Sequence, residues 1–286
     1  MIATTLAGGI GNQLFMYAAA QSLALDKGTQ LVLNTDDGFV NDYQFHRNYE
    51  LDNFNIHYKT NRFLTFNYKG GERIKNLSRK YGLNILCPLY TFLGETTYNK
   101  GIDNRFFEIK SRYIYIEGYW QSEKYFHNHT DYIRKELSFN FKKSDSLLKE
   151  SANILSQKNN IPVCVGVRRY QECVNKPSFG VVEADFYIEA MNYMISKLPI
   201  LPYFYIFSQD VDWVKKNIIP FANCPIKIMD EHTTIEDLYL MSLFKYHIIS
   251  NSSFYWWGAW LANGNLVVST KQFINKDTNL PDWYVI

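Results

Sequence analysis

The stretch MIATTLAGGIGNQLFMYAAAQSLALDKGTQLVLN, residues 1–34, sets the fold class of the chain. A short apolar run at 2–7 meets a cluster of glycines, and an alanine-rich segment at 12–26 then repeats its apolar residues at helical spacing. Gly28 suits the end of that helix, and residues 31–33 form a second apolar run. The order strand, turn, helix, strand predicts a βαβ unit with two parallel strands.

The glycine turn at residues 8–13 does not match either common phosphate-binding motif. No Gly-Lys-Ser/Thr follows it, so it is not a P-loop. Leu14 stands where the last glycine of a G-x-G-x-x-G pattern is required. Glycine still allows another group to approach the backbone closely, and the turn places the amides of Asn12 and Gln13 at a helix start.

The second half of the chain alternates between apolar runs and helical patterns. Strands are expected at 161–167, 203–207, 225–229, 247–250 and 266–269, and helices at 184–198, 210–218, 234–244 and 253–263. This alternation predicts a doubly wound α/β domain with a mostly parallel sheet. Residues 35–160 are less regular, and their aromatic-rich segments at 47–56 and 113–126 are interpreted as strand and loop. The polar segment 142–160 leads to a boundary, so domains are expected at 1–150 and 151–286.

The composition excludes some classes of protein. A length of 286 residues allows one large domain or two ordinary ones, and 47% hydrophobic residues provide a sizeable core. A net charge of +2 is too small to indicate a nucleic-acid partner. The 17% of aromatic residues fit sugar or nucleotide binding and fit an aromatic-rich core equally well. The four cysteines form no C-x-x-C pair, which argues against zinc and favours a reducing compartment.

The sequence predicts a cytoplasmic protein. Met1 leads directly into a strand-like segment without a signal peptide, and no run of apolar residues is long enough for a transmembrane helix. A basic segment is compatible with peripheral contact at the inner face of the membrane, or with a solvated helix face. It consists of Lys69, Arg73, Lys75, Arg79 and Lys80.

Polar residues follow four of the apolar runs in the second half. These ends are Arg168–Arg169, Ser208–Asp210, Asp230–His232 and Asn251–Ser253. Ligands of open parallel sheets lie beyond the carboxyl ends of the strands, so the four ends together predict one binding crevice. Asp210 and Ser253 are also good helix N-caps, and each alone is explained by capping.

The arginine pair is the sharpest of these features. Arg168 and Arg169 follow a buried strand, where a charge is costly unless it is paired or faces an anion. Guanidinium groups match phosphate oxygens, and the helix start near Ser253 adds backbone N–H groups that favour anions. This combination predicts a diphosphate site.

Five segments carry a resemblance to a known family: GGIGNQLFMYAAAQSLA, GYWQSEKYF, VGVRRY, FYIFSQDVDWVKKN and IISNSSFYWWGAWL. In the same order, from residue 8 to about 260, the chain resembles the bacterial α-1,2-fucosyltransferases of glycosyltransferase family 11. The resemblance implies a GT-B-like fold, with two Rossmann-like domains and a donor cleft between them. It implies inverting transfer of L-fucose from GDP-β-L-fucose to O-2 of a terminal galactoside, with no metal and no cofactor.

The same resemblance implies where the substrates bind. The C-terminal domain is expected to bind the co-substrate GDP-fucose. The N-terminal domain is expected mainly to bind the acceptor, a galactose-terminated oligosaccharide or a lipid-linked glycan. The pathway implied is surface polysaccharide or O-antigen synthesis.

The sequence departs from the family pattern at several positions. The family motif His-x-Arg-Arg-x-Asp keeps both arginines here, but Gly166 replaces the histidine and Gln171 replaces the aspartate. Glu172 is a neighbouring acid that could replace that aspartate, and Tyr255 stands where serine is more usual. Donor detail or acceptor choice is therefore expected to differ.

Residue roles follow from these arguments. Arg168, on the β-phosphate, and Asn12, near the fucose or the leaving oxygen, are predicted catalytic residues. The predicted donor-binding residues are Arg169, Ser208, Asp210, Asp230, Asn251, Ser252, Ser253, Phe254 and Gln13. The predicted acceptor-binding residues are His46, Arg47 and Glu117. The general base stays open among Glu117, Asp37, His46 and Glu172, and a loose transition state with little base help is a further alternative.

Three rival interpretations rest on other features. Asp210-Val211-Asp212 would suit a metal-dependent GT-A transferase, although helix capping explains it more simply. The aromatic content would suit a non-catalytic carbohydrate-binding protein. Asp36 and Asp37 at the end of the second strand would suit a Rossmann dehydrogenase.

Overall fold

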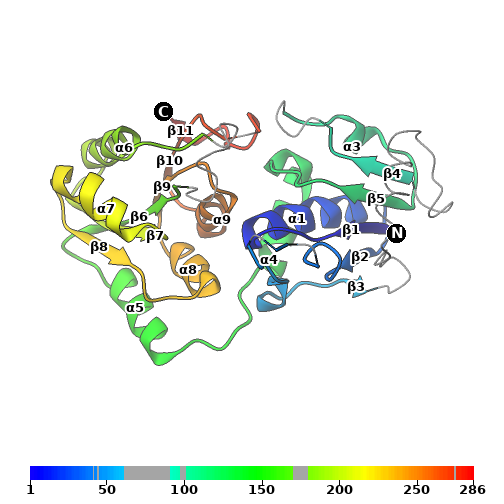
Figure 1. Ribbon diagram of the computed structural model, residues 1–286, viewed down its shortest axis with the longest axis horizontal. Helices are drawn as coiled ribbons and strands as arrows, with labels where there is room; N and C mark the ends of the chain where they lie inside the picture. Colours follow the sequence, from blue (N-terminus) through cyan, green and yellow to red (C-terminus); the bar gives the residue numbers. More distant parts are fainter. Residues whose placement is uncertain (41, 44, 61–90, 97–100, 170–179, 274) are drawn as a thin grey trace. The chain divides into compact units, whose positions relative to one another are not determined.

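The computed structural model describes residues 1–286 except 41, 44, 61–90, 97–100, 170–179 and 274. The chain forms two compact units, Met1–Asn140 and Phe141–Ile286 (Figure 1). The division precedes the boundary expected after residue 150, which falls inside helix α5 (Asp145–Leu155). Helix α5 therefore belongs wholly to the second unit. The basic segment at 69–80, Gln171 and Glu172 lie outside the described residues.

The first unit contains a parallel sheet with the strand order β3-β2-β1-β5-β4. Its strands are β1 (Ile2–Thr5), β2 (Leu31–Asn34), β3 (Lys59–Thr60), β4 (Thr91–Gly94) and β5 (Ile114–Glu117). Its helices are α1 (Ile10–Asp26), α3 (Arg105–Glu108) and α4 (Thr130–Glu136). The parallel pairing of β1 with β2 around α1 confirms the predicted βαβ unit.

Helix α1 is buried on almost every side, which explains its alanine-rich sequence. It begins at Ile10, directly after the glycine turn, and Ala18, Ala19 and Ala20 are fully buried. It ends at Asp26, and Gly28, predicted to suit the helix end, follows with a left-handed φ of 56°. The N–H of Thr29 bonds back to the carbonyl of Ala24 at 2.9 Å, which completes a Schellman motif.

The two aromatic-rich segments of the first unit fold differently. Residues 113–126 contain strand β5 followed by a loop and a 3₁₀ turn, as interpreted from the sequence. Residues 47–56 contain a 3₁₀ turn at Leu51–Asn53, and Phe54 forms a single antiparallel bridge to Phe139. The side chain of Asn53 donates to the carbonyl of Glu50 at 2.8 Å, which favours a turn over an extended strand.

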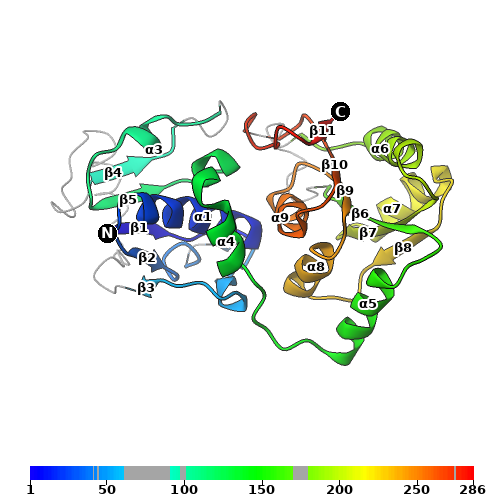
Figure 2. The same cartoon turned by 180° about the vertical axis from the view of Figure 1, so that it is seen from behind.

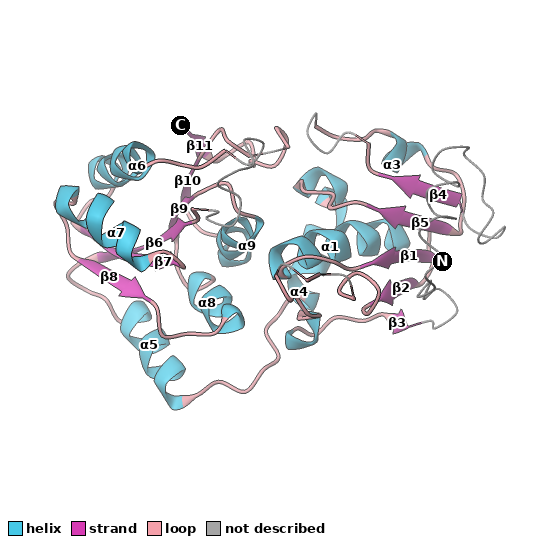
Figure 3. Ribbon diagram, viewed as in Figure 1, coloured by secondary structure: helices cyan, strands magenta, loops and turns pink. Residues whose placement is uncertain are grey.

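The second unit contains a parallel sheet with the strand order β11-β10-β9-β6-β7-β8 (Figure 3). Its strands are β6 (Ile161–Val167), β7 (Pro202–Ser208), β8 (Ile226–Met229), β9 (Tyr246–Ile249), β10 (Leu266–Ser269) and β11 (Tyr284–Val285). Besides α5, its helices are α6 (Ala184–Lys197), α7 (Val211–Asn217), α8 (Thr234–Met241) and α9 (Ser253–Ala262). The expected alternation of strands and helices is confirmed.

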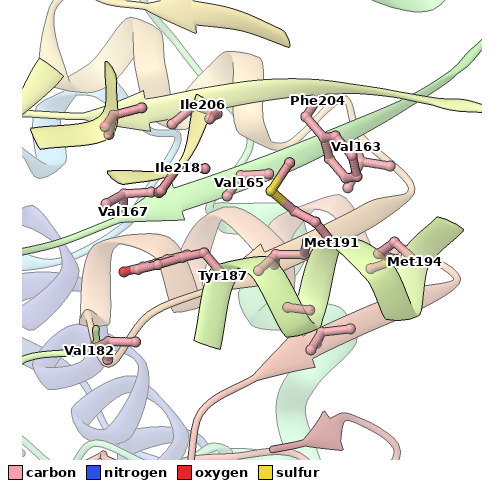
Figure 4. Close-up of a cluster of buried hydrophobic side chains, with 14 residues drawn as sticks. Val163, Val165, Val167, Val182, Tyr187, Met191, Met194, Phe204, Ile206 and Ile218 are labelled. Atoms are coloured by element: carbon pink, nitrogen blue, oxygen red, sulfur yellow. The ribbon is translucent and has the colours of Figure 1, made fainter. Parts of the chain in front are cut away.

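Helices cover both faces of this second sheet. Helix α6 buries Tyr187, Ala190, Met191 and Met194 at helical spacing against Val163 and Val165 of β6 (Figure 4). The alternate residues of β6 point to the other face, where Gly166 meets α9. Helices α8 and α9 pack side by side, as Figures 1 and 2 both show. This arrangement places the start of α9 beside the carboxyl end of β6.

No helix within the described ranges combines the length and the apolar character needed to cross a membrane.

Candidate functional site

Hydrogen bonds tie three neighbouring strand ends of the second unit together. The hydroxyl of Tyr255 shares its single proton between the carbonyls of Val167, at 3.1 Å, and Phe207, at 3.0 Å, and so joins the carboxyl ends of β6 and β7. The N–H of Ser250 donates to the carbonyl of Gly166 at 3.1 Å and joins β9 to β6. The strand ends at Arg168, Ser208 and Ser250 therefore meet at one edge of the sheet.

The backbone of Arg168 is held in place, and its guanidinium group contacts the loop after β7. Its N–H donates to Ser250 Oγ at 3.1 Å, and its Nη1 donates to Gln209 Oε1 in the loop after β7. The carbonyl just before it, that of Val167, accepts from Tyr255. Both sides of the Val167–Arg168 peptide are thus fixed, so the start of the Arg168 side chain has one defined position.

Arg169 makes several contacts within the second unit. Its Nη1 donates to the carbonyl of Val182 and to Glu183 Oε2, both at 3.0 Å. Its Cζ lies 4.1 Å from the centroid of the Trp213 ring, a cation–π contact. Arg169 therefore connects the residues just before α6 to α7. Its supporting role in binding the donor stays a prediction.

Ser208 and Asp210 build the start of α7. Ser208 Oγ accepts from the N–H of Asp210 at 3.0 Å, and Asp210 Oδ1 accepts from the N–H of Trp213 at 3.1 Å. Asp210 is therefore the N-cap of α7, which is the simpler of the two explanations of the Asp210-Val211-Asp212 sequence. No group of three or more His, Cys, Asp or Glu side chains within the described ranges is placed to hold a metal ion.

The segment Asn251–Phe254 leads from β9 into α9. Asn251 Nδ2 donates to the carbonyls of Gly180, at 2.7 Å, and Gln272, at 3.2 Å, so its amide holds the loop before α6. Ser252 is buried and is the N-cap of α9, and its hydroxyl makes no side-chain cap. Ser253 and Phe254 are half-buried in the first turn. The first turn of α9 presents backbone N–H groups at this edge, and a helix start favours anions.

After β8, His232 and Asp237 form a half-buried pair that the sequence did not reveal. Asp230 is exposed. His232 Nδ1 lies 3.8 Å from Asp237 Oδ1, and burial raises the pKa of Asp237 to about 7. The Thr233–Glu236 capping box marks the start of α8 in the sequence, and Asp237 follows one position later on the buried side.

Two of the departures from the family pattern are in direct contact. A Cβ at Gly166 would lie 2.3 Å from Cγ of the Tyr255 ring, far inside any normal contact distance. A side chain at position 166 and the Tyr255 ring therefore exclude each other. The two departures therefore act as a single change in packing. This change lies next to Arg168, because Gly166 is two residues before it and the Tyr255 hydroxyl bonds the carbonyl of Val167.

In the first unit, Asn12 and Gln13 lie at the glycine turn but have different surroundings. Asn12 Oδ1 accepts from Gln121 Nε2 at 2.8 Å, which connects the turn to the loop after β5. Gln13 is fully buried; its amide donates to the carbonyls of Gly8 and Asn48 and accepts from the N–H of Glu50. The amide of Gln13 holds the turn in place, and its predicted contact with the donor is not tested by these bonds.

The predicted acceptor residues lie in two places of the first unit. The guanidinium of Arg47 lies about 3.8 Å from where a Cβ on Gly9 would stand, so it borders the glycine turn. His46 is exposed, with a left-handed φ of 50°. Glu117 ends β5 and is half-buried.

Glu95, at the end of β4, is a residue that the sequence reasoning missed. Its Oε2 accepts from the N–H groups of Tyr119 and Trp120 at 2.9 and 3.0 Å, and burial raises its pKa. Trp120 has a left-handed φ of 52°, so this carboxylate holds a strained loop. The next residue is Gln121, which contacts Asn12. No local signal identifies Glu95, because β4 is a short strand in an irregular part of the sequence.

Comparison with solved structures identifies the fold. The fold is similar to that of Arabidopsis thaliana FUT1 in complex with GDP, with a TM-score of 0.56, 10% identity and coverage of 93% of this chain and 69% of that one. It is also similar to NodZ α-1,6-fucosyltransferase soaked with GDP-fucose, with a TM-score of 0.51, 12% identity and coverage of 91% and 92%. With its two parallel α/β sheets, the protein has the GT-B glycosyltransferase fold.

The family follows from the sequence comparison. The profile described as Glycosyl transferase family 11 matches residues 1–286, and the chain belongs to that family. It is 31% identical to an α-1,2-colitosyltransferase of Escherichia coli, over 98% of this chain and 94% of the relative. It is 29% identical to the O-antigen biosynthesis glycosyltransferase WbnK of Escherichia coli, over 94% of this chain and 93% of the relative. The resemblance seen in the sequence is thereby confirmed.

Proposed function

We propose that this family 11 glycosyltransferase moves L-fucose from GDP-β-L-fucose to O-2 of a terminal galactoside, with inversion and without a metal ion. The observation that supports this most directly is Arg168, whose backbone is fixed on both sides at the carboxyl edge of the sheet. The acceptor is a galactose-terminated oligosaccharide or a lipid-linked glycan of surface polysaccharide or O-antigen synthesis. This pathway is inferred from the name of the relative WbnK, and the α-1,2 linkage from the name of the colitosyltransferase.

The donor class is inferred from the site and from structures of similar fold. Cleavage of the sugar–phosphate bond leaves growing negative charge on GDP, which the protein must stabilise in the transition state. Arg168 supplies a positive charge to the β-phosphate, and the first turn of α9 at Ser252 and Ser253 supplies backbone N–H groups. The two solved structures described above contain GDP and were soaked with GDP-fucose, respectively, which supports a guanosine diphosphate leaving group.

Metal independence is part of the same proposal. In the proposed reaction, the guanidinium group and the helix start stabilise the charge that a divalent ion neutralises in a GT-A transferase. Transfer is expected to continue unchanged in excess EDTA. Loss of activity in EDTA, with recovery on adding a divalent ion, would instead support the rival based on Asp210-Val211-Asp212.

The acceptor side is assigned to the carboxyl edge of the first sheet. Asn12 and Arg47 border the glycine turn there, and Glu117 ends β5. Under this proposal Asn12 lies near the transferred sugar or the leaving oxygen, while Arg47, His46 and Glu117 contact the acceptor. Replacing Arg47 or Glu117 is expected to raise KM for the galactoside more than KM for the donor.

A second donor sugar is favoured by one specific finding. A relative 31% identical to this chain is a colitosyltransferase, and colitose is L-fucose without its 3-hydroxyl group. A site that hydrogen-bonds the 3-hydroxyl rejects the deoxy sugar strongly, whereas an apolar site accepts either sugar. The two donors therefore have to be compared directly.

The test is incubation with GDP-fucose or GDP-colitose and a panel of β-galactosides, with the product linkage determined by NMR. An α-1,2-linked fucosyl product, with kcat/KM higher than for GDP-colitose, is the expected result. A preference for GDP-colitose would replace the proposed sugar but keep the site. No transfer from either donor, together with no binding of GDP by calorimetry, would overturn the function and favour a carbohydrate-binding protein.

A further inference from the structure

The second sheet has an opposite edge, formed by the amino ends of its parallel strands. The loops that enter β8, β7 and β6 lie next to one another there, because these strands are neighbours in the sheet. Asn160 Nδ2 donates to the carbonyl of Leu201 at 3.1 Å, and the N–H of Phe204 donates to the carbonyl of Pro225 at 3.0 Å. These bonds connect the three loops into one continuous surface.

Large apolar side chains are exposed on this edge. They are Leu155, 66% exposed, Ile200, 45%, Leu201, 46%, Ile219, 36%, and Phe221, 60%. One lies at the end of α5 just before β6, two lie in the loop before β7, and two lie in the turn before β8. A single exposed apolar residue needs no explanation, but five on three adjacent loops form a patch.

The charges at the entries to β6, β7, β8, β9 and β10 all have the same sign, whereas exposed Asp282 stands at the entry to β11, at the other end of the sheet from β8. Exposed lysines stand at the entries to four neighbouring strands: Lys158, Lys197, Lys215, Lys216 and Lys245. No aspartate or glutamate occurs in the edge segments 155–161, 196–202, 214–226, 242–246 and 262–266, all of which are described. The opposite, carboxyl edge does contain acids, among them Asp210, Asp230 and Glu236. The positive charge is therefore a property of the amino ends of β6 to β10 and not of the unit as a whole.

We propose that this amino-edge patch, the five apolar residues and five lysines named above, docks on the surface of an anionic lipid bilayer. Apolar side chains insert at the boundary between headgroups and acyl chains, while lysines extend toward lipid phosphates. The absence of any acid in these segments fits a uniformly negative partner such as a lipid surface. When the amino edge contacts the lipid headgroups, the opposite, carboxyl edge of the sheet, which carries Arg168, faces away from the membrane.

The proposal does not depend on which sugar is transferred. A bilayer partner fits a transferase whose acceptor is lipid-linked, yet binding to vesicles can be measured without donor or acceptor. Failure of the lipid proposal and failure of the proposed reaction are therefore separate results.

The experiment is co-sedimentation of the full chain with vesicles of phosphatidylglycerol and phosphatidylcholine, compared with vesicles of phosphatidylcholine alone. Binding is expected only to the anionic vesicles and is expected to weaken as salt is raised. The double variant Lys215→Gln/Lys216→Gln is expected to bind about 25-fold more weakly, at about fivefold for each lysine near the surface. Its matched control is Lys110→Gln/Lys135→Gln, which removes two exposed lysines of the first unit and is expected to bind normally.

The apolar part of the patch has its own test. Leu155→Ser/Phe221→Ser is expected to reduce vesicle binding at least tenfold, whereas Phe107→Ser, at a residue 51% exposed in the first unit, is expected to bind like wild type. Melting curves identify any variant that fails to fold, and Leu201→Ser then replaces it. Transfer to a soluble galactoside is expected to stay at the wild-type rate in every patch variant.

Three results would overturn the proposal. Equal binding to both kinds of vesicle would show that the lysines do not recognise anionic lipid. Unchanged binding by folded patch variants would show that another surface of the protein contacts the vesicles. Self-association of wild type that is lost in the apolar variant, without vesicle binding, would identify a second copy of this chain as the partner.

Discussion

The contact between Gly166 and Tyr255 makes a sharp quantitative prediction. A Cβ added at Gly166 would lie 2.3, 2.5 and 2.8 Å from three carbons of the Tyr255 ring. The ring is buried, and its hydroxyl is bonded to the ends of β6 and β7, so it has no free direction in which to move. Gly166→Ala is therefore expected to force the ring aside and to break the hydrogen bond that the hydroxyl shares between those two strand ends.

The cost follows from these two effects. Overpacking a well-filled core costs about 1–3 kcal/mol, and each lost hydrogen bond costs about 1 kcal/mol. The free energy of unfolding of the second unit should fall by about 2–4 kcal/mol. Tyr255→Ala should itself cost about 3–5 kcal/mol, because it leaves a cavity. In that background Gly166→Ala no longer meets the ring and should cost nothing, so the pair should couple by about 3 kcal/mol.

The assay is chemical unfolding of the full chain, followed by tryptophan fluorescence. Five of the six tryptophans belong to the second unit: Trp213, Trp256, Trp257, Trp260 and Trp283. The matched control is Gly9→Ala, whose Cβ would be 3.8 Å from its nearest neighbour and which should unfold like wild type. Unfolding of Gly166→Ala at the wild-type denaturant concentration, or strictly additive costs in the double variant, would refute the packing.

Three further predictions concern catalysis and pH. Arg168→Ala should lower kcat by about 10²–10³-fold while the variant unfolds like wild type, and near-normal turnover would remove the assignment of the phosphate contact. Burial raises the pKa of Asp237 from 3.8 to about 7, so the free energy of unfolding should decline as pH rises from about 4 to about 7. The variant Asp237→Asn should remove that decline and should be more stable than wild type at pH about 8. Urea unfolding across pH measures both effects. Burial lowers the pKa of His247 from 6.5 to about 4. The contribution of the neutral imidazole to stability should therefore be complete above about pH 6.5 and be lost as pH falls toward 4. A His247→Gln variant that loses stability over the same pH range as wild type would contradict the role of His247.

The sequence was most informative where an apolar run has clear ends. Strand β6 occupies residues 161–167 as predicted, because a parallel strand buried on both faces appears as an unbroken apolar segment. The strand end at Arg168 was found for the same reason, since the polar residues begin where burial stops. Strands β3 and β4 were not found, because each is short and partly exposed and so has little apolar pattern.

The contacts that shape the site could not be predicted from local patterns. Tyr255 meets Val167 from 88 positions away, and Gln121 meets Asn12 from 109 positions away. Asp210 was correctly seen as a possible helix cap, because capping depends on residues three apart. The cation–π contact of Arg169 with Trp213 depends on how the segment after β6 packs against α7 and has no sequence spacing that would reveal it.

The most direct test of the central claim is a crystal structure of the protein with GDP bound. The guanidinium of Arg168 is expected to make hydrogen bonds to the diphosphate beside the first turn of α9. A diphosphate bound elsewhere, with Arg168 still on Gln209 and no nucleotide contact at the strand ends, would contradict it.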